Sequence, residues 1–222
     1  MIEATYVDHM GTDLTVVNAA RVSFGKKSEA LGTSGVEGQF MTPILNDPDK
    51  KLINYLARHK HTSPFGHCFA SFHVAAPIFV ARQLVKHKFL RWNEISRRYV
   101  SDTPTFYRPA LWREKSEDKK QGSGEGGKSQ YFPDLYASET EEAALSYYFK
   151  MLGQGVCEEQ ARMILPQSTM TEWYWSGSLD ALADMCKLRT KDDTQYETRK
   201  VAYAISDKMN NLFPISWRAL VL

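Results

Sequence analysis

The hydrophobic and polar positions of this chain follow a helical period over most of its length. One example is the stripe formed by Leu52, Ile53, Leu56 and Ala57, whose spacing places these side chains on one helix face. The pattern predicts helices from Asp47 to a breaker at His61, from Pro77 to about Phe89, from Ser138 to about Leu152, from Glu158 to Leu165, from Ser178 or Leu179 to about Arg189, and from Thr194 to Phe213.

Start and stop signals accompany several of these helices. Asp47-Pro48 reads as an N-cap followed by proline at the first helical position, and Pro214 ends the last helix. Ser138 and Glu141 have the spacing of a capping box. In the helix opened by Pro77, the spacing directs Ile78, Ala81, Leu84 and Val85 toward the core.

Two stretches alternate in the manner of strands. Asp13–Phe24 predicts a strand followed by a turn, and a glycine-rich loop then continues to about Asn46. Cys68–Val74 predicts a second strand, with phenylalanine and valine spaced for a sheet. Helices that flank a few antiparallel strands predict an α+β fold, in which the helices pack around a small antiparallel sheet.

Composition narrows the class of protein. The 222 residues suit one large domain or two small ones, and 43% hydrophobic with 24% charged residues is ordinary globular usage. The longest apolar runs, such as Ala75–Ala81, are too short to span a membrane, and the N-terminus shows no secretory signal. Cys68, Cys157 and Cys186 predict neither a disulfide framework nor a zinc knuckle, so we expect a cytoplasmic setting without a membrane partner.

One low-complexity segment interrupts the pattern. The glycine-rich run Gln121–Lys128 follows the mixed-charge run Arg113–Lys120, and both compositions oppose packing. We expect residues 113–130 to form a flexible surface loop, inserted in a single domain that spans residues 1–222.

Cationic side chains concentrate in the stretch Arg82–Tyr99, although the formal net charge of the whole chain is only +2. If the segment before Phe89 is helical, Gln83, Lys86 and His87 share one face near its C-terminal end. Arginine and lysine gathered beside serine suit phosphate recognition, and Trp92 and Tyr99 offer stacking surface. A solvated basic face or a nucleic-acid patch explains the same composition, but near-neutral overall charge weighs against nucleic acid.

Other candidate chemistry is weaker. His59, His61 and His67 suggest a metal site, but Arg58 and Lys60 alternate with them and disfavour a bound cation, so we predict no metal. No cysteine has the basic neighbourhood of a nucleophile, since His67 and Cys68 would point to opposite sides of a strand.

Two further arginines have both a structural and a functional interpretation. Arg162 precedes Pro166 on an otherwise apolar turn, where it would either pair with Glu158 or Glu159 or bind an anionic ligand. Arg189 ends a predicted helix, where it would either complement the helix dipole or donate to a phosphate or carbonyl.

Several motifs together resemble the flavin-dependent thymidylate synthases. Lys86-His87-Lys88, followed after seven residues by Ser96, resembles the Arg-His-Arg-x7-Ser signature of that family. The segments that resemble other family motifs, in the family's order, are Ala20-Arg21-Val22-Ser23, His61-Thr62-Ser63-Pro64-Phe65-Gly66-His67, Ala75–Gln83, Asn93–Tyr99, Ala161–Pro166 and Leu188-Arg189. The resemblance covers nearly the whole chain, and the combination is far more specific than the basic triplet alone.

The resemblance implies a homotetramer, with active sites shared between subunits, that makes dTMP from dUMP. Methylenetetrahydrofolate would be the carbon donor, and FAD reduced by NADPH would supply the hydride. The Pro-Cys-His-Gln motif that carries the nucleophile of classical thymidylate synthases is absent here, in agreement with the lack of an activated cysteine.

Site residues follow from the matching positions. The positions that match dUMP contacts are Gln83, Glu94, Ser96, Arg97, Arg98, Arg162 and Arg189. The positions that match flavin contacts are Ser63, Lys86, His87, Lys88, Phe89, Glu94, Ser178, Asp184 and Asp193. Arg189 and His61 are the candidate catalytic residues, with His61 orienting flavin, folate or nicotinamide. Ser96 lacks an adjacent base and is therefore assigned to phosphate binding.

The chain departs from the family pattern at several of these positions. Lys86 and Lys88 keep the charge of arginine but lose its bidentate geometry, and Gly66 replaces a glutamate that would hydrogen-bond the flavin. Ser178, Asp184 and Asp193 stand where amide or imidazole side chains are expected.

Overall fold

The computed structural model describes residues 1–35, 41–116, 122–124, 127 and 131–221. Its strands are β1 (Glu3–Met10), β2 (Gly32–Ser34), β3 (Thr42–Ile44), β4 (Phe69–Pro77), β5 (Leu90–Glu94) and β6 (Met170–Ser178). Its α-helices are α1 (Asp13–Arg21), α2 (Asp47–Arg58), α3 (Ile78–Leu84), α4 (Tyr131–Gly153), α5 (Glu158–Ala161), α6 (Leu179–Arg189), α7 (Tyr196–Leu212) and α8 (Pro214–Val221). Short 3-10 helices are η1 (Val22–Phe24), η2 (Ser63–His67) and η3 (Arg162–Ile164).

A four-stranded antiparallel sheet in the order β1-β4-β6-β5 forms the centre of the fold. Neighbouring strands place their apolar residues in register, so that Phe72 pairs with Trp175 and Val74 with Trp173. All four side chains are buried on the same face, because alternate residues of a strand point to the same side. This face and the helices that cover it form the hydrophobic core, and the predicted α+β class is confirmed.

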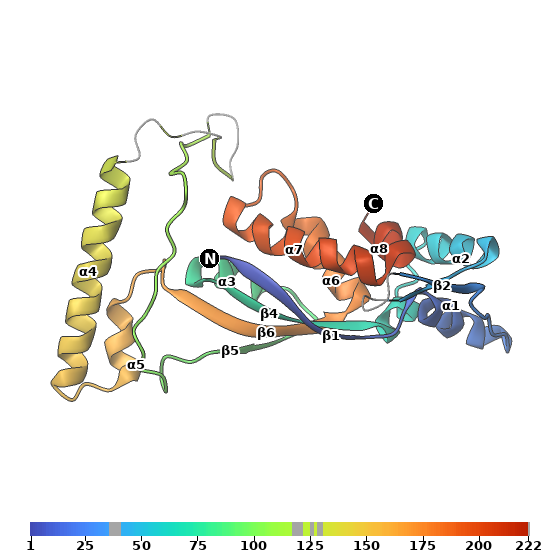
Figure 1. Cartoon of the computed structure of the whole chain (residues 1–222), viewed down its shortest axis with the longest axis horizontal. Coiled ribbons are helices and arrows are strands. Elements are labelled where there is room, and N and C mark those ends of the chain that lie inside the picture. Colours follow the sequence, from blue (N-terminus) through green and yellow to red (C-terminus); the bar gives the residue numbers. More distant parts are fainter. Residues whose placement is uncertain (36–40, 117–121, 125–126, 128–130, 222) are drawn as a thin grey trace.

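The sheet is covered on one side. Helices α6, α7 and α8 lie together over one face of the strands (Figure 1), and their buried residues belong to the same core cluster. The opposite face carries Tyr174, which is 53% exposed, and His73, which pairs with Glu172 across 3.3 Å. A sheet face with such exposed aromatic and charged side chains is available for contact with another molecule.

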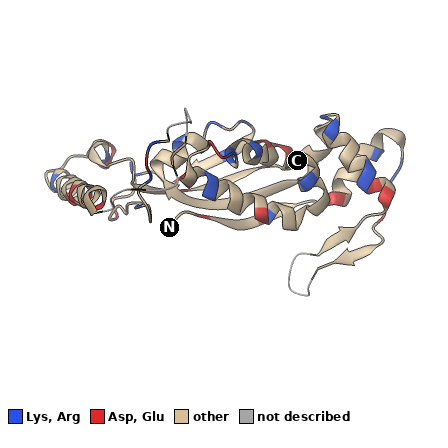
Figure 2. Cartoon of the chain, turned by 90° about the horizontal axis from the view of Figure 1, so that it is seen from above, with Lys and Arg blue, Asp and Glu red and all other residues tan. Residues whose placement is uncertain are grey.

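Two parts extend from this centre. Helices α4 and α5 form an arm at one end of the molecule, and α1 and α2 lie at the opposite end (Figure 1). The hairpin of β2 and β3 projects from the body of the chain (Figure 2), with Gly32 opposite Ile44. In the described residues, no helix is both long and apolar enough to cross a membrane.

The predicted strand at Asp13–Phe24 is wrong, because Asp13–Arg21 is helix α1 and the strand is Glu3–Met10 instead. Thr12 begins the helix through a capping box with Thr15. Val16 and Val17 are fully buried, and their packing outweighs the preference of β-branched residues for strands.

Helix boundaries shift in several places. The helix opened by Pro77 ends at Leu84 and not near Phe89, which leaves Val85 50% exposed where it was expected in the core. Ser138 lies inside α4, with its hydroxyl donating to Glu142, so it is not an N-cap. Pro214 ends α7 as predicted and at the same time opens α8. The helix predicted from Glu158 to Leu165 is divided, because α5 ends at Ala161 and the 3-10 helix η3 continues only to Ile164. The segments predicted for α2, α6 and α7 agree to within about two residues, as expected for helix ends.

The predicted loop at 113–130 is held where it begins. The Arg113 guanidinium donates to both carboxylate oxygens of Glu197 on α7 at 2.8 Å, and its Nε donates to Ser123 Oγ at 2.7 Å. Residues 117–121, 125, 126 and 128–130 of this predicted loop lie outside the described part of the chain.

This ion pair predicts a large loss of stability on mutation. Glu197 is 2% exposed, so Glu197→Ala leaves the Arg113 charge partly buried and unpaired. We expect the free energy of unfolding to fall by about 3 kcal/mol. Urea denaturation followed by circular dichroism measures this loss, with the exposed Glu139→Ala on α4 as the control. Equal midpoints for the two variants would mean that the pair does not anchor this segment.

Candidate functional site

Three predicted site residues meet where α3, α6 and α7 come together. Arg189, at the end of α6, donates from Nε to His87 Nε2 at 2.8 Å and from Nη2 to the Gln83 carbonyl at 2.9 Å. Gln83 and Arg189 line a pocket of about 370 Å³. Residues far apart in sequence thus form one hydrogen-bonded group, which we call the Arg189 cluster (Gln83, His87 and Arg189). The helix-dipole interpretation of Arg189 is therefore incomplete, because its guanidinium has directed partners.

Two residues that the sequence analysis missed hold the Gln83 side chain. Thr198 donates from Oγ1 to Gln83 Oε1 at 3.1 Å, and the Gln83 amide nitrogen donates to Gln195 Oε1. Thr198 is fully buried on the first turn of α7. The sequence carries one signal for Thr198, because it is a polar residue on the core-facing side of the helix predicted from Thr194. These contacts orient the amide of Gln83 before any ligand arrives.

The electrostatics of the Arg189 cluster keep His87 neutral. Burial lowers the pKa of His87 to about 4, the nearby Arg189 charge contributes to the same shift, and Asp184 acts in the opposite direction. A neutral imidazole can accept the hydrogen bond that Arg189 donates, whereas a protonated one cannot. Burial also lowers the pKa of Arg189.

The shift of His87 predicts a pH dependence of stability. The unfolded chain binds a proton near the ordinary pKa of 6.5, whereas folded His87 binds it only near about 4. The contribution of His87 is therefore complete above pH 6.5 and is lost as pH falls toward about 4. We expect His87→Gln, which does not titrate, to lose less stability over this window. Urea midpoints of both proteins at pH 5 and pH 7 test this, and parallel losses would contradict it.

The basic triplet Lys86-His87-Lys88 lies in the turn between α3 and β5. Lys86 and Lys88 are both exposed, one on each side of His87 in the sequence. Phe89 is 84% exposed, and its backbone φ of 65° is in the left-handed region. This turn presents two cations and an aromatic ring beside the edge strand β5. The predicted helical face containing Lys86 is wrong because α3 has already ended, although Gln83 and His87 still meet at Arg189.

Predicted dUMP residues follow on β5 and after it. Glu94 is held at the sheet edge, where its Oε1 accepts from Thr171 Oγ1 at 2.6 Å and its Oε2 accepts from Trp92 at 3.1 Å. Arg97 donates to the Asp102 carbonyl at 3.0 Å, whereas Arg98 donates to Ser96 Oγ, at 3.3 Å from Nε. Arg98 and Ser96 thus form a hydrogen-bonded pair without an acidic partner among the described residues, which leaves the guanidinium available to an anion.

Arg162 lies on η3 and is exposed, although the turn around it reads as apolar in the sequence. Its Nε donates to the Glu159 carbonyl at 3.3 Å, and within the described ranges neither Glu158 nor Glu159 forms a side-chain ion pair with it. The guanidinium therefore remains available to an anion.

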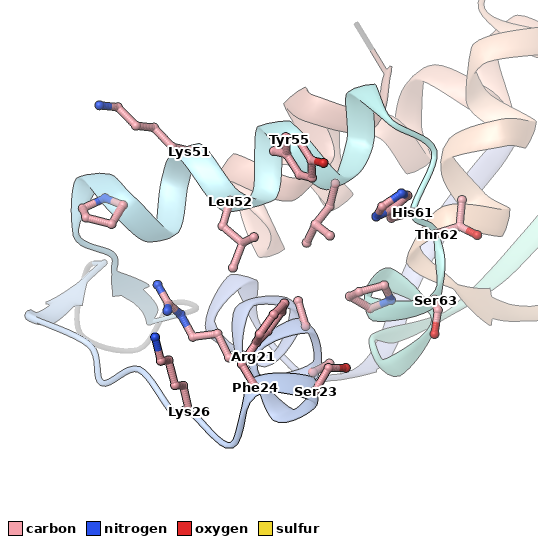
Figure 3. Close-up of a pocket in the computed structure, with 15 residues that line it drawn as sticks. Arg21, Ser23, Phe24, Lys26, Lys51, Leu52, Tyr55, His61, Thr62 and Ser63 are labelled. Carbon is pink, nitrogen blue, oxygen red and sulfur yellow. The ribbon is translucent and has the colours of Figure 1, made fainter.

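His61 and Ser63 lie in a different place, in a cavity of about 1060 Å³ between α1 and α2. Figure 3 shows both residues at one end of this cavity, where the chain leaves α2 and enters η2. The His61 ring also lies 6.0 Å from the Tyr55 ring, measured between centroids. The predicted flavin residues thus lie in several places, among them this cavity and the α3–β5 turn.

The remaining predicted flavin positions lie around α6. Ser178 is the N-cap residue of α6, Asp184 is exposed and lies 3.7 Å from Lys187, and exposed Asp193 lines the same pocket as Arg189. Asp184 therefore has an ion-pair partner on its own helix, while Asp193 borders the Arg189 cluster.

Two of the three cysteines, Cys68 and Cys186, are buried and poorly suited to act as nucleophiles. Burial raises the pKa of Cys68 to about 12, and burial also raises the pKa of Cys186. Among the residues that the structure describes, no group of three or more His, Cys, Asp or Glu side chains could hold a metal ion.

The fold and the Arg189 cluster define an α+β protein that gathers arginine and amide donors at helix ends. Comparisons with known proteins show the family to which such a chain belongs. Residues 5–215 match the family model described as thymidylate synthase complementing protein. The flavin-dependent thymidylate synthase of one Thermus thermophilus strain is 39% identical over 213 residues, which cover 96% of this chain and 73% of that protein. That of Wolbachia pipientis wMel is 36% identical, and the match covers 97% of this chain and 72% of that protein.

A solved structure shares the whole fold. The UMP/dUMP methylase PolB from Streptomyces cacaoi, in a crystal structure with 5-Br dUMP, matches with a TM-score of 0.83 and 31% identity. The match covers 99% of this chain and 94% of that chain. The chain therefore belongs to the flavin-dependent thymidylate synthase family, and it is an enzyme.

Proposed function

We propose that this enzyme methylates dUMP to dTMP, with methylenetetrahydrofolate as carbon donor, FAD as cofactor and NADPH as reductant. The observation that carries the proposal is the Arg189 cluster, on a fold shared with a methylase that was crystallised with 5-Br dUMP. Arginine and an oriented amide are suited to bind a pyrimidine ring through its carbonyl and N–H groups.

The nucleotide would be bound from both ends. We assign the phosphate to Ser96, Arg98 and Arg162, since charge-assisted hydrogen bonds from guanidinium groups suit its oxygens. Glu94 and Arg97 position the segment that carries Ser96 through their own hydrogen bonds. Gln83 and Arg189 would contact the uracil ring, where a fixed positive charge stabilises negative charge as it develops.

The residues of the α3–β5 turn fit the anionic part of FAD. Lys86 and Lys88 are cations that form no ion pair within the described part of the chain, beside the exposed ring of Phe89. They would hold the pyrophosphate, and His87 would keep its ring neutral toward Arg189, because its pKa is lowered to about 4 by burial. When bound and reduced by NADPH, FAD supplies the hydride for the reaction.

No nucleophile on this chain is needed for the proposal. Buried Cys68 stays protonated, because burial raises its pKa to about 12, and Ser96 Oγ accepts from Arg98. Neither group therefore resembles an activated nucleophile. His61 would orient flavin or folate at its end of the cavity, with Ser63 as a further polar contact. Ser178, Asp184 and Asp193 would be additional flavin contacts around α6.

We further propose a homotetramer that shares its active sites between subunits. His61 and Ser63 belong to the cavity between α1 and α2, whereas the other site residues lie on or next to α3, β5, η3 and α6. A second copy that supplies one group to the other would complete the site, and the exposed sheet face with Tyr174 supports such contacts. The family match over residues 5–215 also supports a single domain, and the free cysteines suit a cytoplasmic setting.

The experiment is an assay of dTMP formation by purified protein supplied with dUMP, methylenetetrahydrofolate, FAD and NADPH. We expect dTMP only when all four are present, and omission of any one should stop turnover. Formation of dTMP without folate, or its absence from the complete mixture, would contradict the proposal.

A further inference from the structure

The cavity of about 1060 Å³ between α1 and α2 has two chemically different ends. Figure 3 places His61, Thr62 and Ser63 at one end, and Arg21 and Lys26 at the other. Lys51 lines the same cavity from α2, and its side chain points outward from the rim, away from Arg21 and Lys26 (Figure 3). The cavity follows α2 from Pro48 to beyond its last residue, Arg58, a helical rise of about 15 Å. It is therefore long enough for an elongated ligand with unlike ends.

Apolar and aromatic side chains form its middle. Leu52 and Tyr55 come from α2, and Phe24 from η1 lies across the cavity from Leu52 (Figure 3). Phe24 is 78% exposed, so the face of its ring is free to stack. Such walls favour a planar aromatic group between the two polar ends.

The end of the cavity opposite His61 is positively charged. Among the described residues that line the cavity, Arg21, Lys26 and Lys51 are cationic and none is acidic. Arg21 forms an ion pair with the fully buried Asp49, which neutralises its charge. Asp49 Oδ1 also accepts from Ser28 Oγ at 3.0 Å. Lys26 and Lys51 form no ion pair with any described residue, so they are the charges left for an anion.

We propose that Lys26 and Lys51 bind the glutamate carboxylates of the folate co-substrate, and that they favour folates with a polyglutamate tail. This inference rests on the proposed function, in which a folate is the carbon donor. Folate combines an aromatic ring system with an anionic tail, which matches an aromatic middle and a cationic end. The phosphates of FAD are the alternative anions, but Lys86 and Lys88 of the α3–β5 turn already suit them.

The test compares methylenetetrahydrofolate carrying one glutamate with the form carrying five. For the original enzyme we expect a lower KM with the pentaglutamate. In the Lys26→Ala/Lys51→Ala variant the pentaglutamate KM should rise about five- to tenfold, the size expected for two exposed charge pairs, with little change in kcat. The monoglutamate KM should change much less. Added salt should reduce the pentaglutamate advantage only in the original enzyme.

Lys50→Ala is the matched control, because Lys50 lies next to Lys51 on α2 but does not line the cavity and pairs with Asp47 at 3.1 Å. Binding of folic acid mono- and pentaglutamate, followed by calorimetry, gives a second readout that does not require turnover. Equal KM values for the two folates in the original enzyme, or equal losses for both folates in the variant, would overturn the inference. A fall in FAD affinity would instead assign the lysines to flavin phosphates. Failure of dTMP formation with both folates would overturn the proposed function, while the calorimetry would still test the tail.

Discussion

Arg189→Ala is expected to lower the rate of dTMP formation by about 10²- to 10³-fold, the loss typical of removing a donor aimed at developing charge. The substitution removes the guanidinium that donates to His87 and to the Gln83 carbonyl, and with it the cation proposed to polarise the uracil ring. Turnover under saturating substrates, measured as dTMP formed, tests this directly.

Arg189→Lys separates charge from geometry at the same position. Lysine keeps a cation but cannot reproduce the two directed bonds of the guanidinium, so we expect only a small recovery of turnover. Circular dichroism checks that both variants remain folded. Turnover close to that of the original enzyme in Arg189→Ala would remove this residue from the proposed catalytic group.

Arg98→Ala and Arg162→Ala are each expected to weaken dUMP binding by about 10- to 100-fold, the loss of one charge-assisted hydrogen bond to a phosphate. Neither side chain holds an acidic partner among the described residues, since Arg98 donates to Ser96 Oγ and Arg162 to the Glu159 carbonyl. The free energy of unfolding should therefore change by less than about 0.5 kcal/mol. Calorimetric titration with dUMP and, separately, with deoxyuridine measures the effect, since the nucleoside lacks the phosphate.

The control is Arg218→Ala, an exposed arginine with a neutral partner, because its Nε donates to Asn210 Oδ1 at 3.0 Å. We expect this variant to bind dUMP as the original enzyme does. Unchanged dUMP affinity in either site variant would remove that arginine from the phosphate site, and an equal loss for deoxyuridine would place it at the ring.

Local pattern was sufficient for the helices whose apolar stripes pack on the sheet. The segments that became α2, α6 and α7 were predicted because their spacing and their stop signals agree. The segment that became α1 was not, because its adjacent valines favour a strand and only burial against other elements makes them helical. β5 was missed because it is short and lies inside the basic stretch that dominated the interpretation of residues 82–99.

The candidate site, like the fold, could be predicted from the sequence only in part. The sequence identified Gln83, His87 and Arg189 separately, through motifs, and tertiary structure then joined them by hydrogen bonds. The support from Thr198 and Gln195 depends on how α7 packs against α3, which no local pattern encodes. Lys26 and Lys51 belong to segments that meet only when α1 and α2 enclose a cavity, so their joint role could not be predicted either.

The most direct test of the account is the visible absorption spectrum of the purified protein supplied with FAD, recorded before and after addition of dUMP. We predict a bound-flavin spectrum that shifts with dUMP, because the proposal places flavin and pyrimidine in one site. A protein that binds no flavin, with or without dUMP, would contradict it and would indicate that Lys86, Lys88 and Gly66 no longer support the cofactor.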